Sequence, residues 1–238
     1  MPVLQTWTLH QPEPGDRPLT PQTGWGQVPA TGLSDLLEGA GYRLEQVERT
    51  SAFDLGSDPA LLRARRDEAL RFAGEDYRLV RWTPPTPPEY RAGYADLRAR
   101  MDTDMPSGEL ETIAARWDAD RVARWDQLFL DSGEHLSVVA AQYVPTGELV
   151  AFNELVVGLD RSASTHQLGT LVRGDHRGRR LGTIVKCEGL LHWQQEMPAS
   201  PRVLTYNAEE NRPMLDVNEA VGFVPVAAAA GWQKRLDV

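Results

Sequence analysis

The sequence contains a single cysteine, Cys187, in 238 residues, so no disulfide can form within the chain. Proteins of oxidising compartments commonly carry disulfides, whereas proteins of reducing compartments rarely do. We therefore expect a cytoplasmic protein. Cys187 has apolar neighbours on a segment with helical spacing, which favours a small core residue over a nucleophile.

Long apolar runs and excess positive charge are also missing. No segment approaches the roughly 18 apolar residues that a membrane-spanning helix needs, and the N-terminus lacks the pattern of a signal peptide. The formal net charge is −9, which argues against nucleic-acid binding because that requires a basic face. With 41% hydrophobic residues, the chain is an ordinary globular protein with no membrane, nucleic-acid or metal partner expected.

One basic segment departs from this acidic background. Residues 169–182 read Gly-Thr-Leu-Val-Arg-Gly-Asp-His-Arg-Gly-Arg-Arg-Leu-Gly, and helical spacing follows from Thr183. The pattern predicts a strand, a tight turn and the opening of a helix. Free N–H groups at a helix start, surrounded by arginines, suit a phosphate or pyrophosphate. The same residue types also occur at solvated helix caps, so the segment alone leaves both interpretations open.

Hydrophobic periodicity predicts an α/β protein from residue 77 onward. We expect strands over 77–82, 135–143, 148–157, 165–173, 202–206, 223–226 and 232–236, and helices over 89–101, 118–129, 183–193 and 211–222. Antiparallel hairpins come first, and a strand–helix–strand crossover then gives a parallel pair. The predicted fold is a mixed central β-sheet flanked by helices on both faces.

This order, with the basic turn after the fourth strand, resembles the GNAT superfamily of acyl-CoA N-acyltransferases. His176-Arg-Gly-Arg-Arg-Leu-Gly182 stands where that family has its Q/R-x-x-G-x-G/A pyrophosphate loop. Thr205 to Met214, followed by Asn218-Glu-Ala-Val-Gly-Phe223, is similar to the family's helix after the fifth strand. The resemblance covers residues 77–236 and implies an enzyme that uses acetyl-CoA as its acyl donor.

The resemblance also implies where acetyl-CoA binds. Backbone groups of Leu171, Val172 and Arg173 would bond the pantetheine arm. The pyrophosphate would lie on Arg177, Gly178, Arg179, Arg180, Leu181, Gly182 and Thr183. Asn207, Asn211 and Asn218 are further candidates, although capping of turns and helices is an equally common role for asparagine.

Two positions depart from the family pattern. Arg180 replaces the middle glycine of the loop, which is tolerable if its φ angle stays negative. Asn218 replaces the tyrosine that frequently serves the family as general acid. An amide can hydrogen-bond a thiolate but cannot give it a proton. Tyr206 lies nearby in the sequence and is a candidate substitute.

Acetyl transfer to an amine benefits from a general base, because only the neutral amine attacks. Glu154 is our first candidate, with an outward-facing strand carboxylate as the alternative. His166 is the second, since imidazole commonly exchanges protons near neutral pH. Asp102, Asp104, Glu109 and Glu111 lie in a segment that often walls the acceptor site in this family. They would favour a cationic amine, although a solvated acidic loop is the simpler interpretation.

The first 75 residues look like a partial second unit of the same kind. Leu36-Leu-Glu-Gly-Ala-Gly-Tyr42 parallels Val217-Asn-Glu-Ala-Val-Gly-Phe223, and Val3-Leu-Gln-Thr-Trp7 parallels Val203-Leu-Thr-Tyr-Asn207. We therefore divide the chain into a partial GNAT-like β-α-β unit with a linking helix over 1–75 and a GNAT domain over 76–238. A partial unit cannot bury both of its faces alone, so we expect it to dock on the C-terminal domain or across a homodimer.

Together these patterns predict an N-acetyltransferase that acts on the primary amine of a small molecule. An acetyltransferase of protein amines and a non-catalytic acyl-CoA-binding or regulatory module are the alternatives. The acceptor itself is not encoded in any motif found here, because one fold hosts many acceptor sites.

Overall fold

The computed structural model describes residues 2–11, 15–104, 106–111 and 115–236, without the side chain of Asp102. The strands are β1 (Val3–His10), β2 (Pro18–Leu19), β3 (Val28–Pro29), β4 (Arg43–Asp54), β5 (Tyr77–Trp82), β6 (His135–Tyr143), β7 (Glu148–Val157), β8 (Thr165–Val172), β9 (Arg202–Ala208) and β10 (Val224–Arg235). The helices are α1 (Gly32–Gly39), α2 (Ala60–Ala73), α3 (Pro88–Asp104), α4 (Ala119–Ser132), α5 (Leu181–Glu196) and α6 (Arg212–Val221), with a 3-10 turn over Gly174–His176.

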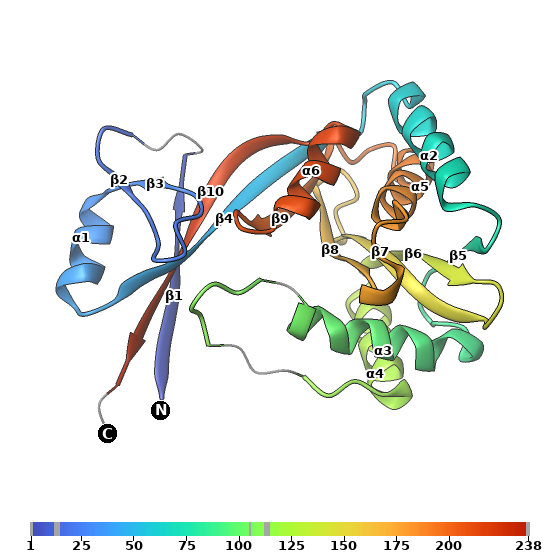
Figure 1. The fold of residues 1–238 in the computed structure, drawn as a ribbon, viewed down its shortest axis with the longest axis horizontal. Coiled ribbons are helices and arrows are strands. Elements are labelled where there is room, and N and C mark those ends of the chain that lie inside the picture. The colour runs from blue at the N-terminus through green and yellow to red at the C-terminus, as the bar shows by residue number, and fades with distance from the viewer. Residues whose placement is uncertain (1, 12–14, 105, 112–114, 237–238) are drawn as a thin grey trace.

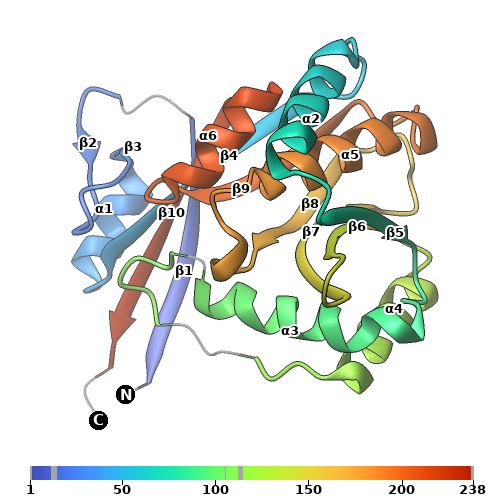
Figure 2. The same cartoon turned by 45° about the vertical axis from the view of Figure 1, so that its right-hand side comes forward.

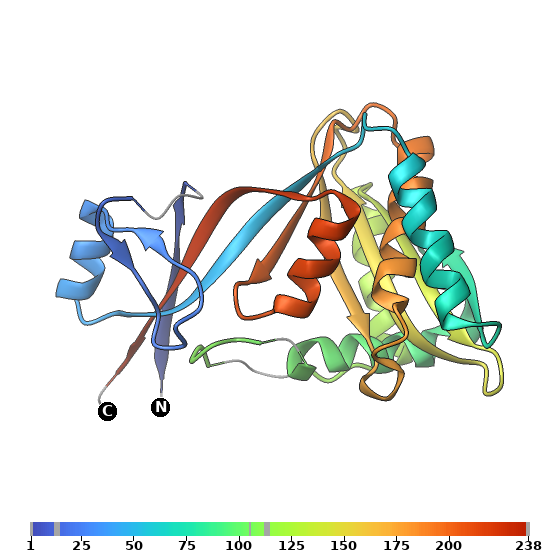
Figure 3. The ribbon, with the colours of Figure 1, turned by 45° about the horizontal axis from the view of Figure 1, so that its top comes forward.

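One eight-stranded sheet runs through the molecule in the order β1-β10-β4-β9-β8-β7-β6-β5, and β2 and β3 form a separate pair (Figure 1). Helices α3 and α4 cover one face of the sheet, while α2, α5 and α6 lie on the other (Figures 2 and 3). Every neighbouring pair in the large sheet is antiparallel except β8 and β9. The predicted mixed sheet with helices on both faces is confirmed.

Apolar cores lie on both sides of the central strands. Tyr94 and Leu97 of α3 and Val122 of α4 pack with Phe152 of β7 on one face. On the other face, α5 is buried along most of its length. Its sequence is accordingly apolar on nearly all sides of the helix and not amphipathic. No helix in the described part of the chain is long and apolar enough to cross a membrane.

An arm built from β1, α1, β4 and β10 extends from this body, and both chain termini lie at its end (Figure 1). Strand β4 lies between β9 and β10, and β1 pairs with the far edge of β10. Thus β1-α1-β4 repeats the order of β9-α6-β10, and the first strand of each unit pairs with the long strand of the other. The N-terminal segment docks on the rest of its own chain by strand pairing. The division at residue 75 stays a prediction.

The two short strands predicted near the C-terminus are wrong, because β10 is one strand from Val224 to Arg235. The run from Ala227 to Gly231 has low strand propensity, yet it lies between β1 and β4 and pairs with both. Small residues suit this place. A Cβ atom at Gly231 would lie 2.9 Å from the Trp7 ring, so the indole packs directly on the glycine.

Candidate functional site

The parallel strands β8 and β9 separate soon after they meet. They pair only at Thr165–Val203 and His166–Leu204, and then diverge (Figure 3). On the other edge of β8, the register with β7 shifts next to Leu168, which is the extra residue of a bulge. The sheet is therefore open along the second halves of these two strands.

A cavity of about 530 Å³ lies at this opening. Its walls come from the end of β8, the basic loop with the start of α5, the first turns of α6, and the end of α3. The lining residues include Thr170, Leu171, Val172, Arg177, Gly178, Arg180, Leu181, Gly182, Thr183, Asn211, Met214, Val217, Asp104 and Glu210. Most residues predicted for the acetyl-CoA loop thus meet at one cavity.

The loop between β8 and α5 turns through two left-handed residues. Gly178 has a φ of 76° and Arg180 a φ of 58°, and Arg180 is the one non-glycine residue with positive φ in the described chain. The condition under which an arginine would be tolerated at this position, a negative φ, is therefore not met at Arg180. Two contacts with α2 hold its side chain: an ion pair of 2.6 Å with Glu68 and a stack 4.5 Å from the Phe72 ring centroid.

This turn presents its backbone N–H groups at the start of α5. The first N–H groups of a helix have no carbonyl partner within it. From Gly178 to Thr183, none donates to a carbonyl of the described residues. A Cβ atom at Gly178 would meet nothing within 4 Å, so the loop backbone is open to a ligand there.

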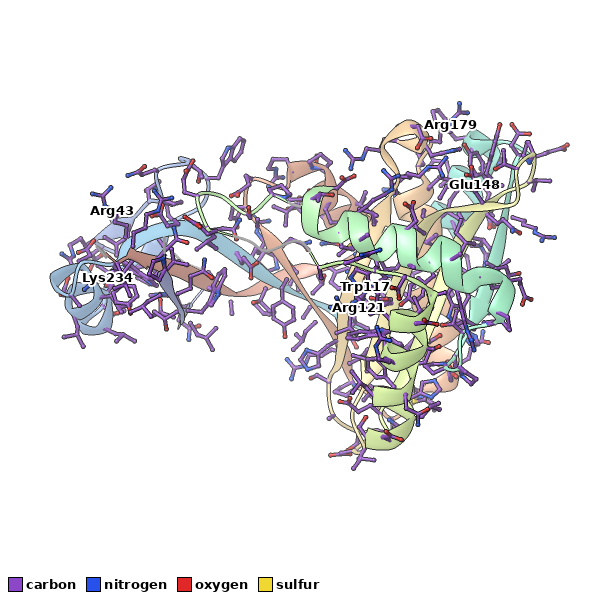
Figure 4. The ribbon with its side chains drawn as sticks, turned by 90° about the horizontal axis from the view of Figure 1, so that it is seen from below. Arg43, Trp117, Arg121, Glu148, Arg179 and Lys234 are labelled. Atoms are coloured by element: carbon purple, nitrogen blue, oxygen red, sulfur yellow. The ribbon has the colours of Figure 1, made fainter. Side chains whose placement is uncertain are left out.

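The four arginines of this region are bonded differently. Arg173 donates to Asp175 and to Glu148, and its bond with Asp175 raises its pKa above the usual value. Arg177 pairs with Asp104 at 2.7 Å, and Arg180 is held by α2. Arg179, at the same corner of the molecule as Glu148, makes no ion pair with any described residue (Figure 4). Of these four arginines, Arg179 therefore has no ion pair to break within the described chain, whereas Arg177 and Arg180 line the cavity.

The backbone hydrogen bonds of β8 differ from those expected for a pantetheine site. The Arg173 N–H donates to the Val150 carbonyl at 2.8 Å, so it is bonded to β7. Successive residues of a strand direct their N–H and C=O groups to opposite edges. Leu171 therefore also bonds toward β7, while Thr170 and Val172 face the opening. The prediction moves from Leu171 and Arg173 to Thr170 and Val172.

Glu154, the first candidate base, is fully buried. Its carboxylate accepts hydrogen bonds from the Tyr94 hydroxyl and from Arg98, at 2.7 and 2.9 Å for the arginine. The Arg98 guanidinium lies 4.5 Å from the Trp117 ring centroid and 4.4 Å from that of Trp125. Trp117 also stacks with Arg121 near the start of α4 (Figure 4). Glu154 thus joins β7 to α3 through an ion pair with Arg98, which in turn stacks on Trp125 of α4.

His166 and Tyr206 lie together on the more open face of the sheet. His166 Nδ1 is 3.0 Å from the Tyr206 hydroxyl, and the two rings stack at an interplanar angle of 9°. The neighbouring Gln167 bonds to α5, so strand alternation places His166 on the opposite face. Tyr206 is 44% exposed, and partial burial raises its pKa. Of the predicted catalytic residues, these two are accessible and touch each other.

The three predicted asparagines have different surroundings. Asn211 lines the cavity before α6, while Asn218 is almost fully buried and donates to the Asn207 side chain at 2.7 Å. Asn218 also accepts a hydrogen bond from Lys186 of α5. Sequence reasoning missed Lys186, although a lysine within the apolar run of residues 181–193 was a visible signal.

Of the acidic residues expected near the acceptor, only Asp104 lines the cavity. Glu109 and Glu111 lie beside β10: Gln233 donates to the Glu109 carbonyl, and Glu111 is 3.6 Å from Arg235. The Asp102 side chain lies outside the described residues. Cys187 is buried, which raises its pKa to about 12 and leaves it a thiol. No cluster of His, Cys, Asp and Glu in the described chain could hold a metal ion.

Comparison with known proteins identifies the fold. No family model and no curated protein matches the chain. A tandem GNAT protein from the clavulanic acid biosynthesis pathway is similar in structure, with 24% identity and a TM-score of 0.70 over 99% of this chain and 65% of that one. A GCN5-related N-acetyltransferase from Sphaerobacter thermophilus has 13% identity and a TM-score of 0.61, over 99% of this chain and 62% of that one.

These likenesses show the fold. The chain has the GNAT fold, and the resemblance inferred from its two motifs is confirmed at that level. The chain spans somewhat less than two thirds of these two proteins, at 65% and 62% of their lengths.

Proposed function

From the GNAT fold and this cavity, we propose that the protein is an N-acetyltransferase that transfers the acetyl group of acetyl-CoA directly to the primary amine of a small molecule. The observation that carries the proposal is the opening between the parallel strands β8 and β9, which ends at a basic loop over a cavity of about 530 Å³. A pantetheine arm is narrow and carries two amides. Backbone groups of Thr170 and Val172 would bond it as a further strand would.

The pyrophosphate would lie on the loop from Gly178 to Thr183. Its free N–H groups and the positive end of α5 favour a negative charge. Arg179 is available without breaking an ion pair, and Arg177 can exchange Asp104 for a phosphate oxygen. Arg180 also ties this loop to α2 through Glu68 and Phe72.

In the proposed reaction, the amine nitrogen attacks the thioester carbonyl, a C–N bond forms, the C–S bond breaks, and CoA leaves as a thiolate. The attacking amine must lose a proton. Of the candidate bases, we favour His166 over Glu154, since Glu154 is buried and bonded to Tyr94 and Arg98. When His166 Nδ1 donates to Tyr206, Nε2 keeps a free lone pair for that proton.

A non-catalytic acyl-CoA-binding module is the second candidate. The observation that favours it is Asn218, which stands at the family's general-acid position and is bonded to Lys186 and Asn207. Acetylation of a protein amine keeps the same acyl-CoA site and differs only in the acceptor.

Binding of acetyl-CoA, measured by calorimetry, followed by CoA release with a panel of amines, tests the proposal. We expect binding, and release that depends on an amine. Arg179→Ala should weaken binding about tenfold, as expected for one charge-assisted hydrogen bond. Arg43→Ala removes the same charge from the arm and should change nothing (Figure 4). Binding without release across small amines and peptides would favour the non-catalytic module.

A further inference from the structure

Lys186 is one of two lysines in the chain, against 23 arginines, and it is fully buried. Its ammonium group donates to Gln167 Oε1 at 2.9 Å and to Asn218 Oδ1, and it lies 5.2 Å from the Phe223 ring centroid. A buried charge is unfavourable unless its bonds are satisfied. Lys186 has no role in the reaction proposed above, so its burial must have another cause.

The bonds of Lys186 continue the joint between β8 and β9 where backbone pairing ends. The last backbone pair is His166–Leu204. One residue further along, Gln167 Nε2 donates to Thr205 Oγ1 at 2.8 Å, so side chains link the two strands. Gln167 Oε1 accepts from Lys186 and from Asn153 of β7, which fixes the direction of its amide.

A second branch of the same network runs from Lys186 to Asn207. Since Lys186 is a donor only, Asn218 must turn its Oδ1 toward the ammonium group and its Nδ2 away. Asn218 Nδ2 then donates to Asn207 Oδ1 at 2.7 Å. With Oδ1 engaged, Nδ2 is the end of the Asn207 amide that makes no hydrogen bond to another described residue. The ammonium charge thereby decides which end of the Asn207 amide is available.

We propose that Lys186 is a positioning residue for acyl-CoA: through Gln167 it sets the separation of β8 and β9, and through Asn218 it orients the Asn207 amide beside the opening. This inference rests on the proposed function. Lys186 touches neither the acyl group nor the amine and acts only through these two partners.

The network also makes binding sensitive to pH. The partners that face Lys186 from β7, β8, β9 and α6 are amides and hydroxyls, and the neighbouring Cys187 thiol is the one titratable group that acts on it among the described residues. Burial lowers the pKa of Lys186 to about 7. A neutral amine is a weaker donor to Asn218, and CoA is an anion. Affinity for acetyl-CoA should therefore fall as pH rises through 7.

The test is the dissociation constant of acetyl-CoA between pH 6 and pH 9, with thermal melts to confirm folding. Lys186→Met, of similar length, should weaken binding about tenfold at pH 6 and flatten the pH dependence. Asn207→Ala should give a similar loss, and the double variant should lose less than the two single losses multiplied together, because one of the two branches from Lys186 passes through Asn207. Lys234→Met is the matched control in the arm (Figure 4).

The outcomes are distinguishable. If Lys186→Met does not fold, Asn218→Leu breaks the branch to Asn207 from α6 and should give the same loss as Asn207→Ala at pH 6. Acetyl-CoA binding that these variants leave unchanged, or losses that multiply in the double variant, would overturn the inference alone. Absence of acetyl-CoA binding to the unmodified protein would overturn the proposed function, and this inference with it.

Discussion

Two strand–helix–strand units, β9-α6-β10 and β1-α1-β4, share one architecture and differ in what stands beside them. In both, a short strand leads through a helix to a long strand, and each long strand pairs with the short strand of the other unit. The edge of β9 opposite β4 faces β8 and the basic loop, whereas β1 is the edge of the sheet. The unit itself is a scaffold, and a site forms only where a second parallel strand opens from it.

The helices α1 and α6 also differ at one corresponding position, which is apolar in α1 and polar in α6. In the sequence repeat, Leu37 of α1 corresponds to Asn218 of α6. Leu37 packs against an apolar cluster around Trp232, while Asn218 is bonded to Lys186 and Asn207. The buried polar network is therefore confined to the unit that borders the cavity, as expected if it serves ligand binding.

The largest effect is expected from disrupting β4, the strand that joins the two units. Val47 of β4 is buried in the cluster with Val28, Ala228 and Trp232. Val47→Asp buries an unpaired carboxylate and should lower the free energy of unfolding by about 3 kcal/mol or more. Because β4 lies between β9 and β10, we expect one cooperative transition and loss of acetyl-CoA binding, measured by thermal melting and calorimetry.

Leu36→Asp on α1 is the matched control, since Leu36 is 67% exposed and the same substitution should change stability by less than about 0.5 kcal/mol. Two separate melting transitions in Val47→Asp, with acetyl-CoA still bound, would show that the units are independent.

Lys186 provides the next largest effect, as a change of stability with pH. Its pKa is about 7 in the folded protein, against 10.5 as the ordinary value. Between these values the unfolded chain binds more protons, so the free energy of unfolding rises with pH. The rise from pH 7 to pH 9 should be about 2 kcal/mol, at no more than about 1.4 kcal/mol per pH unit. Denaturant titrations of the wild type and Lys186→Met measure it.

In Lys186→Met this rise should be absent, and subtraction of the two curves removes every other titrating group. With two lysines in the chain, labelling the lysine Cε atoms with ¹³C gives two resonances, and one of them should titrate near pH 7. Two titrations near pH 10 would contradict the prediction.

The sequence was sufficient for the parts of the fold that local patterns encode. Continuous apolar runs located β6 and β7, and the Gly-Arg run located the loop before α5. It could not show that β4 passes between β9 and β10, because strand order depends on pairing between residues far apart in the chain. For the same reason the sequence did not show that β10 is one continuous strand. Its alanines have low strand propensity and lie in the sheet only because they pair with neighbouring strands.

For the site, the sequence located the cavity-lining loop but not its internal bonds. Glu154 is a candidate base or an outward-facing carboxylate as far as its strand shows, yet Arg98 and Tyr94, some 60 residues earlier, engage its carboxylate. Lys186 was overlooked because a lysine on a helix is usually exposed. Side-chain networks that join distant elements leave no periodic signal in the sequence.

Variants of Arg180, which has a left-handed backbone conformation, test whether the shape of the loop after β8 is required for acetyl-CoA binding. Arg180→Val places a β-branched residue at a φ of 58° and should lower stability by about 1 kcal/mol and weaken acetyl-CoA binding. Arg180→Gly loses the contacts to Glu68 and Phe72 but removes the strain, so it should stay within about 0.5 kcal/mol of the wild type. Equal melting temperatures for the two variants would show that the φ angle does not matter.

The smallest effect is expected at the free edge of β1, where the comparison predicts a surface without a role in the cavity. Leu9 is 82% exposed in the monomer. Leu9→Ser should therefore change the free energy of unfolding by less than about 0.5 kcal/mol and leave acetyl-CoA affinity unaltered. Gel filtration with light scattering gives a further readout, because an unpaired strand edge is where a second chain can pair. If Leu9→Ser dissociated a dimer, or if its loss of stability depended on protein concentration, a partner copy would lie beside β1 as β8 lies beside β9. The two units would then be more alike than the single chain indicates.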